Sequence, residues 1–217
     1  MAGKRTYADA CGIARALDVI GERWALLVVR ELLLGPKRFT DLRAGLPHLG
    51  PDVLSQRLRE LDQAGVVRRD QLPPPAGSRV YALTDWGREL ETVVLGLGRW
   101  GSRAPFPSGH EGLGPDALML ALKTLYDPTR TDGLIGTAYE IRLTGQPFEV
   151  RPAARQLDVS RGAPSEPVAT IAADPETLQG ILWHGRKLGD ALRAGELTIA
   201  GDRRAAERLL GLFPLPR

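Results

Sequence analysis

The chain has 217 residues, of which 43% are hydrophobic and 25% are charged. This composition is ordinary for a globular protein and excludes a disordered tail, while the length allows one large domain or two small ones. The single cysteine, Cys11, excludes an internal disulfide and a zinc site built from several cysteines. No apolar run reaches the roughly 18 residues that a membrane helix needs, and no apolar segment follows the charges of the N-terminus. We therefore expect a soluble, cytoplasmic protein without a membrane partner.

The positive charge lies in the first half. Residues 1–105 hold 16 basic and 12 acidic residues, whereas residues 106–217 hold 13 and 14. This asymmetry favours a polyanion as the partner of the first half. The alternative is a solvated basic surface, which would carry the same charge.

A linker is predicted between the two halves. The segment 104–115 contains three prolines and three glycines, a composition typical of connecting segments. We predict a first domain at residues 1–105, a linker at 106–115 and a second domain at 116–217.

The first half begins with helical patterns. Apolar residues recur at steps of three and four between residues 10 and 34, which predicts one or two helices. A short helix is expected at 39–46. The next helix begins at Pro51, because proline suits the first helical position, and ends at Gly65. Its inward face is expected to carry Leu54, Leu58 and Leu61.

A hairpin and a last helix follow. Residues 66–72 and 79–83 are typical of two strands joined by a proline-rich loop. Residues 84–101 predict a helix capped by Thr84 or Asp85. Helix-turn-helix followed by a two-stranded wing is a DNA-binding arrangement, in which the second helix of the pair enters the major groove.

These elements carry a family resemblance across about residues 8–103. The chain resembles HxlR-type winged helix-turn-helix regulators through Cys11, the runs 16–24 and 26–35, Arg38-Phe39, Leu42, and the runs 54–61, 65–67 and 81–90. The resemblance implies a homodimer that binds an inverted-repeat operator in double-stranded DNA. Gly50 and Asp52 depart from the pattern, since serine and a neutral polar residue are common at these two positions.

The helix that begins at Pro51 supplies the candidate base contacts. With its leucines inward, steps of 100° place polar residues outward. Arginine can pair with guanine and glutamine with adenine. The predicted DNA-binding residues are Ser55, Gln56 and Arg59 for bases, Asp52 on the same face, Arg57, Lys37 and Arg38 for phosphates, and Arg79 beside the wing tip. The alternative is a solvated helix face without a ligand.

Two further features of the first half have functional interpretations. The family dimerises through its terminal helices, so the apolar stripe Leu90, Val93, Val94, Leu97 and Trp100 is a candidate dimer surface; the alternative is packing within one chain. Some relatives use a cysteine at the position of Cys11 to sense oxidants or electrophiles, which requires a lowered thiol pKa and access. A buried inert cysteine is the alternative interpretation.

The second half predicts an α+β domain with helices on one face of a sheet. Helices are expected at 116–126, 174–184, 188–194 and 202–212, and strands at 137–143, 148–151, 156–161, 168–172 and 196–201. The whole chain is therefore α+β, with a winged helix-turn-helix domain first.

The second half also carries a resemblance. Residues 172–178, 188–202 and 206–213 are similar to the sterol carrier protein type 2-like fold. The resemblance implies an apolar tunnel that binds lipid-like molecules. Its candidate lining residues, which could equally be ordinary core, are Leu122, Tyr126, Tyr139, Ile141, Phe148, Leu182 and Trp183.

Together these patterns favour a DNA-binding transcriptional regulator, expected to act as a repressor that an apolar effector releases. Thiol sensing through Cys11 is one alternative, and a lipid-binding carrier with a vestigial winged helix is another. Catalysis is not expected, because His48, His110 and His184 are isolated and no metal spacing, nucleophile constellation or phosphate-binding motif is present. No cofactor or metal is predicted.

Overall fold

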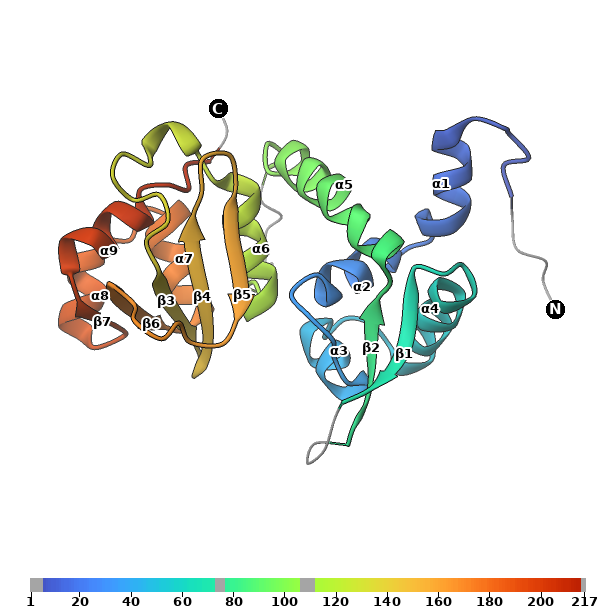
Figure 1. Cartoon of the computed structure of the whole chain (residues 1–217), viewed down its shortest axis with the longest axis horizontal. Helices are drawn as coiled ribbons and strands as arrows, with labels where there is room; N and C mark the ends of the chain where they lie inside the picture. Colours follow the sequence, from blue (N-terminus) through green and yellow to red (C-terminus); the bar gives the residue numbers. More distant parts are fainter. Residues whose placement is uncertain (1–5, 73–76, 106–111, 216–217) are drawn as a thin grey trace. The chain divides into compact units, whose positions relative to one another are not determined.

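The computed structural model describes residues 6–72, 77–105 and 112–215, which form two compact units, Met1–Val94 and Leu95–Arg217 (Figure 1). The units divide inside a helix rather than at the expected linker. Arg99 lies near the end of this helix, which spans Asp85–Gly101. Within the second unit, its guanidinium N–H groups donate hydrogen bonds to the carbonyl oxygens of Thr124 and Tyr126. The expected linker lies further along, and its residues 106–111 are outside the described ranges.

The described residues of the first unit form four helices, a hairpin and most of a fifth helix. The helices are α1 (Gly12–Ile20), α2 (Ala25–Leu32), α3 (Phe39–Gly45), α4 (Pro51–Gln63) and α5 (Asp85–Gly101), and the strands are β1 (Val67–Gln71) and β2 (Arg79–Leu83). These elements confirm the winged helix-turn-helix order predicted from the sequence.

Local chemistry explains several boundaries of these elements. Pro51 opens α4, and Gly65 follows its end at φ +76°, a left-handed conformation that glycine adopts without strain. The hydroxyl of Thr84 accepts a hydrogen bond from the backbone N–H of Gly87 at 3.0 Å, so Thr84 caps α5. Of the two caps considered, Thr84 is therefore the one that makes this bond.

The core of the first unit lies between α2, α3, α4 and the base of the wing. Leu54, Leu58 and Leu61 are buried on the inner face of α4, as their spacing predicts. Burying a leucine contributes about 1.5–3 kcal/mol relative to leaving it exposed. This packing determines which face of α4 remains in contact with solvent.

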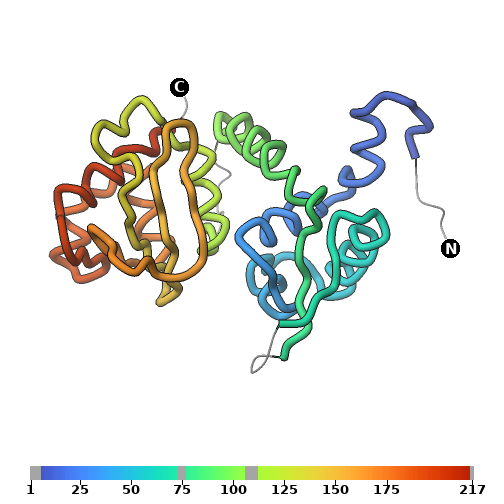
Figure 2. Tube along the Cα trace, in the orientation of Figure 1, coloured from blue at the N-terminus to red at the C-terminus, as the bar shows by residue number. Residues whose placement is uncertain are grey.

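The second unit contains a five-stranded mixed sheet in the order β5-β4-β3-β6-β7. The strands are β3 (Tyr139–Leu143), β4 (Gln146–Pro152), β5 (Leu157–Arg161), β6 (Ala169–Ala173) and β7 (Leu197–Gly201). The Cα trace runs from β3 through β4 and β5 and returns to pair β6 with β3 in parallel (Figure 2). The other strand pairs are antiparallel.

Four α-helices and a short 3-10 helix complete the described part of the second unit. The helices are α6 (Pro115–Leu125), η1 (Pro128–Arg130), α7 (Pro175–Trp183), α8 (Leu188–Ala194) and α9 (Arg203–Leu210).

Helices cover one sheet face, where Tyr139, Ile141 and Phe148 are fully buried. Arg142, Arg151 and Thr198 on the other face are exposed. The sequence predicted these elements to within a few residues, except η1. Across the described ranges, every helix is too short or too polar to cross a membrane.

Candidate nucleic-acid interface

Helix α4 presents a polar outer face opposite its buried leucines. Asp52, Gln56 and Arg59 are exposed, and Ser55 is half-buried at the edge of the face. This arrangement follows from the helical period, because residues 52, 56 and 59 lie on one side when residues 54, 58 and 61 face the core. The outer face therefore offers an amide, a guanidinium and a carboxylate, which are groups that can pair with base edges.

The structure places two of the candidate phosphate contacts in buried positions. Lys37 is 6% exposed, and its ammonium lies 2.5 Å from Oε2 of Glu31. The guanidinium of Arg57 is ion-paired with Glu60 and lies 3.7 Å from Oε2 of Glu22. Each side chain would have to leave a carboxylate partner to reach a phosphate, so neither belongs to the exposed face.

The remaining cationic candidates face solvent. Arg38 precedes α3, Arg59 lies on the outer face of α4, and Arg79 begins β2; all three are exposed. None of them makes an ion pair with another described residue. Their guanidinium groups are therefore available to an external anion, for which a planar, bidentate donor is well suited.

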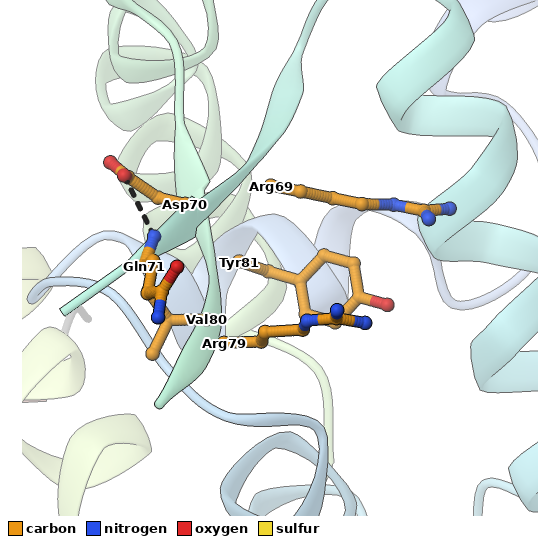
Figure 3. A pocket seen from close by; sticks show the side chains of 6 residues that line it. All are labelled: Arg69, Asp70, Gln71, Arg79, Val80 and Tyr81. Carbon is orange, nitrogen blue, oxygen red and sulfur yellow. Dashed lines mark hydrogen bonds between the residues drawn. The ribbon is translucent and has the colours of Figure 1, made fainter. Parts of the chain in front are cut away.

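The wing carries a cationic hollow that the sequence did not predict. It has a volume of about 450 Å³ and is lined by Arg69, Asp70, Gln71, Arg79, Val80 and Tyr81. Arg69, Tyr81 and Arg79 extend to the same side of the hairpin, with the tyrosine ring between the two arginines (Figure 3). Arg69 also lies 3.4 Å from Asp62 at the end of α4, so the hollow adjoins the recognition helix.

The sequence could have predicted this hollow through the pairing register of the two strands. Arg69 pairs with Tyr81, and Gln71 pairs with Arg79. Residues 69 and 71 share one face of β1 because side chains alternate along a strand. Aligning the two predicted strands about their loop would have placed Arg69 and Tyr81 beside Arg79.

Apolar side chains are exposed on α1 and α5. Ile13 is 72% exposed and Leu17 41% on α1, while Val93, Leu97 and Trp100 are exposed on α5. Leu90 and Val94, from the same predicted stripe, instead pack against the core of the first unit. The stripe on α5 therefore divides into an inner and an outer set.

Cys11 is exposed and occupies the position immediately before α1. Its backbone N–H donates to the carboxylate of Asp9 at 2.8 Å, which holds the start of the helix. The structure thus places the thiol on the surface, beside the helix that carries Ile13 and Leu17.

The candidate ligand-lining residues of the second unit form part of its core. Leu122, Tyr126, Tyr139, Ile141 and Phe148 are buried, and Leu182 and Trp183 are half-buried. Their polar atoms differ in hydrogen bonding. The hydroxyl of Tyr126 donates to the carbonyl oxygen of Ala153 at 2.6 Å, and the indole N–H of Trp183 to that of Phe213 at 2.9 Å.

Tyr139 differs from these two residues. Its buried hydroxyl has no hydrogen-bond partner among the described residues. Burial, with a smaller contribution from the charge of Asp202, raises the pKa of Tyr139, although the charge of Arg208 opposes the change. A buried hydroxyl of this kind can donate to a bound water or ligand.

The described ranges contain no cluster of three or more His, Cys, Asp or Glu side chains able to hold a metal ion. His48 belongs to the first unit and His184 to the second, and His110 is outside the described residues.

A recognition helix with a polar outer face, followed by a hairpin with two guanidinium groups in its hollow, defines a winged helix-turn-helix DNA-binding protein. The family model described as HxlR-like helix-turn-helix matches residues 19–106. The uncharacterized HTH-type transcriptional regulator YvaP of Bacillus subtilis is 39% identical over 94 residues, which cover 43% of this chain and 87% of that protein. The chain belongs to the HxlR-like helix-turn-helix family and is a transcriptional regulator of this type.

Other relatives match the same half of the chain. The HTH-type transcriptional regulator YodB of Bacillus subtilis is 34% identical over 39% of this chain and 76% of its own length. The solved structure of the redox regulator HypR in its oxidized form has 34% sequence identity and a TM-score of 0.40, and covers 45% of this chain and 100% of that chain. The second half is similar to the SCP-2 sterol transfer family, whose model matches residues 118–214.

Proposed function

We propose that the protein is a homodimeric repressor that binds an inverted-repeat operator in double-stranded DNA. Ser55, Gln56 and Arg59 contact bases, with Asp52 beside them on the outer face of α4. The observation that carries this proposal is the division of α4 into a leucine face packed in the core and an exposed face bearing Gln56 and Arg59. Such a division positions a rigid helix with free donors and acceptors for the major groove.

Phosphate contacts are assigned to the exposed arginines around this helix. Arg38 lies at the start of α3, while Arg69 and Arg79 flank Tyr81 in the wing hollow. Arginine forks bind phosphate oxygens bidentately, and such contacts set the register of a protein on DNA. Lys37 and Arg57 are left out of this set because they are buried as well as paired with carboxylates, whereas Arg69 is exposed although it lies 3.4 Å from Asp62.

The dimer is proposed to form through α1 and the outer set of α5. Ile13, Leu17, Leu97 and Trp100 expose apolar surface that a second copy would cover. Two-fold symmetry places two recognition helices on two half-sites, which accounts for an inverted-repeat operator.

The base-reading assignment has a direct test. Duplexes bound by the full-length protein are selected from a randomised pool, and the Kd is measured for the selected operator and for each single base-pair change. Gln56→Ala should abolish discrimination at one base-pair position per half-site, worth about 1–3 kcal/mol. Gln146→Ala, which removes an exposed glutamine in the second unit, should change nothing. An equal loss of affinity on every duplex would contradict base reading by Gln56.

We further propose that the second unit binds an apolar effector that releases the operator. Five of the seven candidate lining residues are buried, as the walls of an enclosed apolar site would be. A fluorescent long-chain fatty acid serves as the probe. Saturable binding that also weakens operator affinity supports an effector role. Binding with no change in operator affinity favours the lipid-carrier alternative for this unit.

A second candidate function is thiol sensing through Cys11. Its exposure and its place at the start of α1 favour this function, because modification there would alter the proposed dimer surface. A quinone should release the operator from the wild-type protein but not from Cys11→Ser. Equal release from both proteins would exclude the thiol as the sensor.

The cellular location, the absence of catalysis and the domain boundaries complete the proposal. The protein acts in the cytoplasm without catalysing a reaction, and residues 106–115 link the domains 1–105 and 116–217. The matches at residues 19–106 and 118–214 support a connection in this region.

A further inference from the structure

Gln56 does not stand alone on the outer face of α4. Its amide nitrogen Nε2 donates to Oε1 of Glu60 at 3.0 Å. The two residues are four apart, so their side chains meet on the helix surface. Gln56 therefore has a fixed partner before any DNA is bound.

Glu60 is itself held from its other side. Its Oε2 accepts a hydrogen bond from Nη1 of Arg57, whose side chain is only 9% exposed. The other terminal nitrogen of Arg57 lies 3.7 Å from Oε2 of Glu22, between α1 and α2. A chain of contacts thus runs from a buried arginine through Glu60 to the exposed amide of Gln56. Because Arg57 is confined by burial, the carboxylate of Glu60 is confined as well.

The chemistry of a carboxylate determines which way the amide of Gln56 is turned. An ionised carboxylate only accepts hydrogen bonds, so the NH2 group of the glutamine must face Glu60 and its carbonyl oxygen must face away. A glutamine that pairs with adenine uses one N–H and its carbonyl oxygen. Glu60 uses the other N–H. The groups needed for base pairing remain free and already oriented.

The charge of Glu60 opposes DNA binding, because a carboxylate beside the major groove repels phosphates. A role in orientation and a role as a mere surface charge therefore predict different results when Glu60 is removed. We infer that Glu60 is a positioning residue for base recognition: it orients the amide of Gln56, and buried Arg57 holds Glu60 in place. This inference rests on the proposed base-reading role of Gln56.

The experiment is a double-mutant cycle on the full-length protein. The variants are Q56A, E60A, Q56A/E60A and E60Q, with D62A as a control that removes one carboxylate from the same helix. For each, the Kd is measured for the selected operator and for duplexes with one base pair changed. Circular dichroism melts confirm that each variant is folded.

Five results are expected. Q56A loses about 5- to 150-fold of discrimination at one base pair, and E60A loses most of the same discrimination while binding non-specific duplexes more tightly. E60Q restores the discrimination only in part, because its single amide oxygen can accept from Gln56 while its NH2 group then faces the guanidinium of Arg57. E60A has no further effect on discrimination in the Q56A background. D62A changes affinity for all duplexes alike.

Two results overturn the inference, and they are distinguishable. If Q56A alters discrimination but E60A only tightens binding to every duplex, base reading by Gln56 stands and the positioning role of Glu60 is wrong. If Q56A alters no base preference, the base-reading role is wrong and the inference falls with it.

Discussion

The backbones of Lys37 and Tyr81 pair through two hydrogen bonds. The N–H of Lys37 donates to the carbonyl oxygen of Tyr81 at 3.0 Å, and the N–H of Tyr81 donates to that of Lys37 at 2.8 Å. This bridge adds the segment before α3 to the edge of the wing. Since the side chain of Lys37 turns inward to Glu31, the same residue joins α2, the start of the helix-turn-helix and the wing.

Removing one charge from the buried ion pair between Glu31 and Lys37 should destabilise the first unit. Glu31 is 2% exposed and also accepts hydrogen bonds from Arg30. Glu31→Gln removes the carboxylate charge that lies 2.5 Å from the buried ammonium of Lys37, and breaking a buried pair in this way typically costs about 3–5 kcal/mol. Urea denaturation should show this loss. The exposed Glu89→Gln should shift the free energy of unfolding by less than about 0.5 kcal/mol.

A double variant distinguishes the net contribution of the ion pair to stability from the cost of removing only one of its two charges. Replacing both charges, Glu31→Leu with Lys37→Met, should recover much of the lost stability, because apolar residues of similar volume often replace a buried ion pair without cost. Stability equal to wild type in Glu31→Gln alone would show that the pair contributes little.

Arg79 should contribute affinity without base preference. Arg79→Ala is expected to weaken binding to all duplexes alike and to reduce the slope of log K against log salt by about 1, because each neutralised phosphate contributes about 0.9 to that slope. Fluorescence anisotropy at several salt concentrations measures it. Arg193→Ala in α8, which removes an exposed arginine from the second unit, should leave the slope unchanged.

Ile13 should be essential for dimerisation. Covering an isoleucine side chain contributes about 1.5–3 kcal/mol, and Ile13→Asp places a charge on the proposed contact instead. The dissociation constant of the dimer should rise by more than about tenfold, with a matching loss of operator affinity. Light scattering reports the mass in solution. Ile135→Asp serves as the control, since Ile135 is 57% exposed in the second unit; a dimer unaffected by Ile13→Asp would contradict the assigned surface.

Asp174 should stabilise the second unit in a pH-dependent way. Burial raises the pKa of this carboxyl, but hydrogen bonds from the backbone and hydroxyl of Thr177 outweigh burial and lower it below the ordinary value. A group whose pKa is lower in the folded state stabilises the fold above its unfolded pKa of about 3.9. That contribution is lost as the pH falls through the folded pKa.

The variant that tests this cap is Asp174→Ala. Removing the cap of α7 should cost about 0.5–2 kcal/mol at pH 7, measured by thermal unfolding. The difference from wild type should shrink below about pH 4. A constant difference from pH 7 to pH 3 would show that ionisation of Asp174 plays no part.

Much of the fold was predictable because its signals are local. The spacing of Leu54, Leu58 and Leu61 identified the buried face of α4, since the helical period depends on neighbouring residues alone. Alternation predicted both strands of the wing for the same reason. The exposed positions of Gln56 and Arg59 followed directly.

Local periodicity could not predict which charged side chains would be buried and paired with other elements. Lysine and arginine are usually surface residues, yet packing of α2, α3 and α4 encloses Lys37 and Arg57 and supplies Glu31 and Glu22 as partners from other elements. Only Glu60, three residues from Arg57 on α4, is a partner that the helical period could have indicated. Contacts between elements also place the division of the compact units inside α5 rather than at the proline-rich segment. Local periodicity identifies which residues share a face, whereas the enclosure and pairing of a charge depend on neighbours that come together when the chain folds.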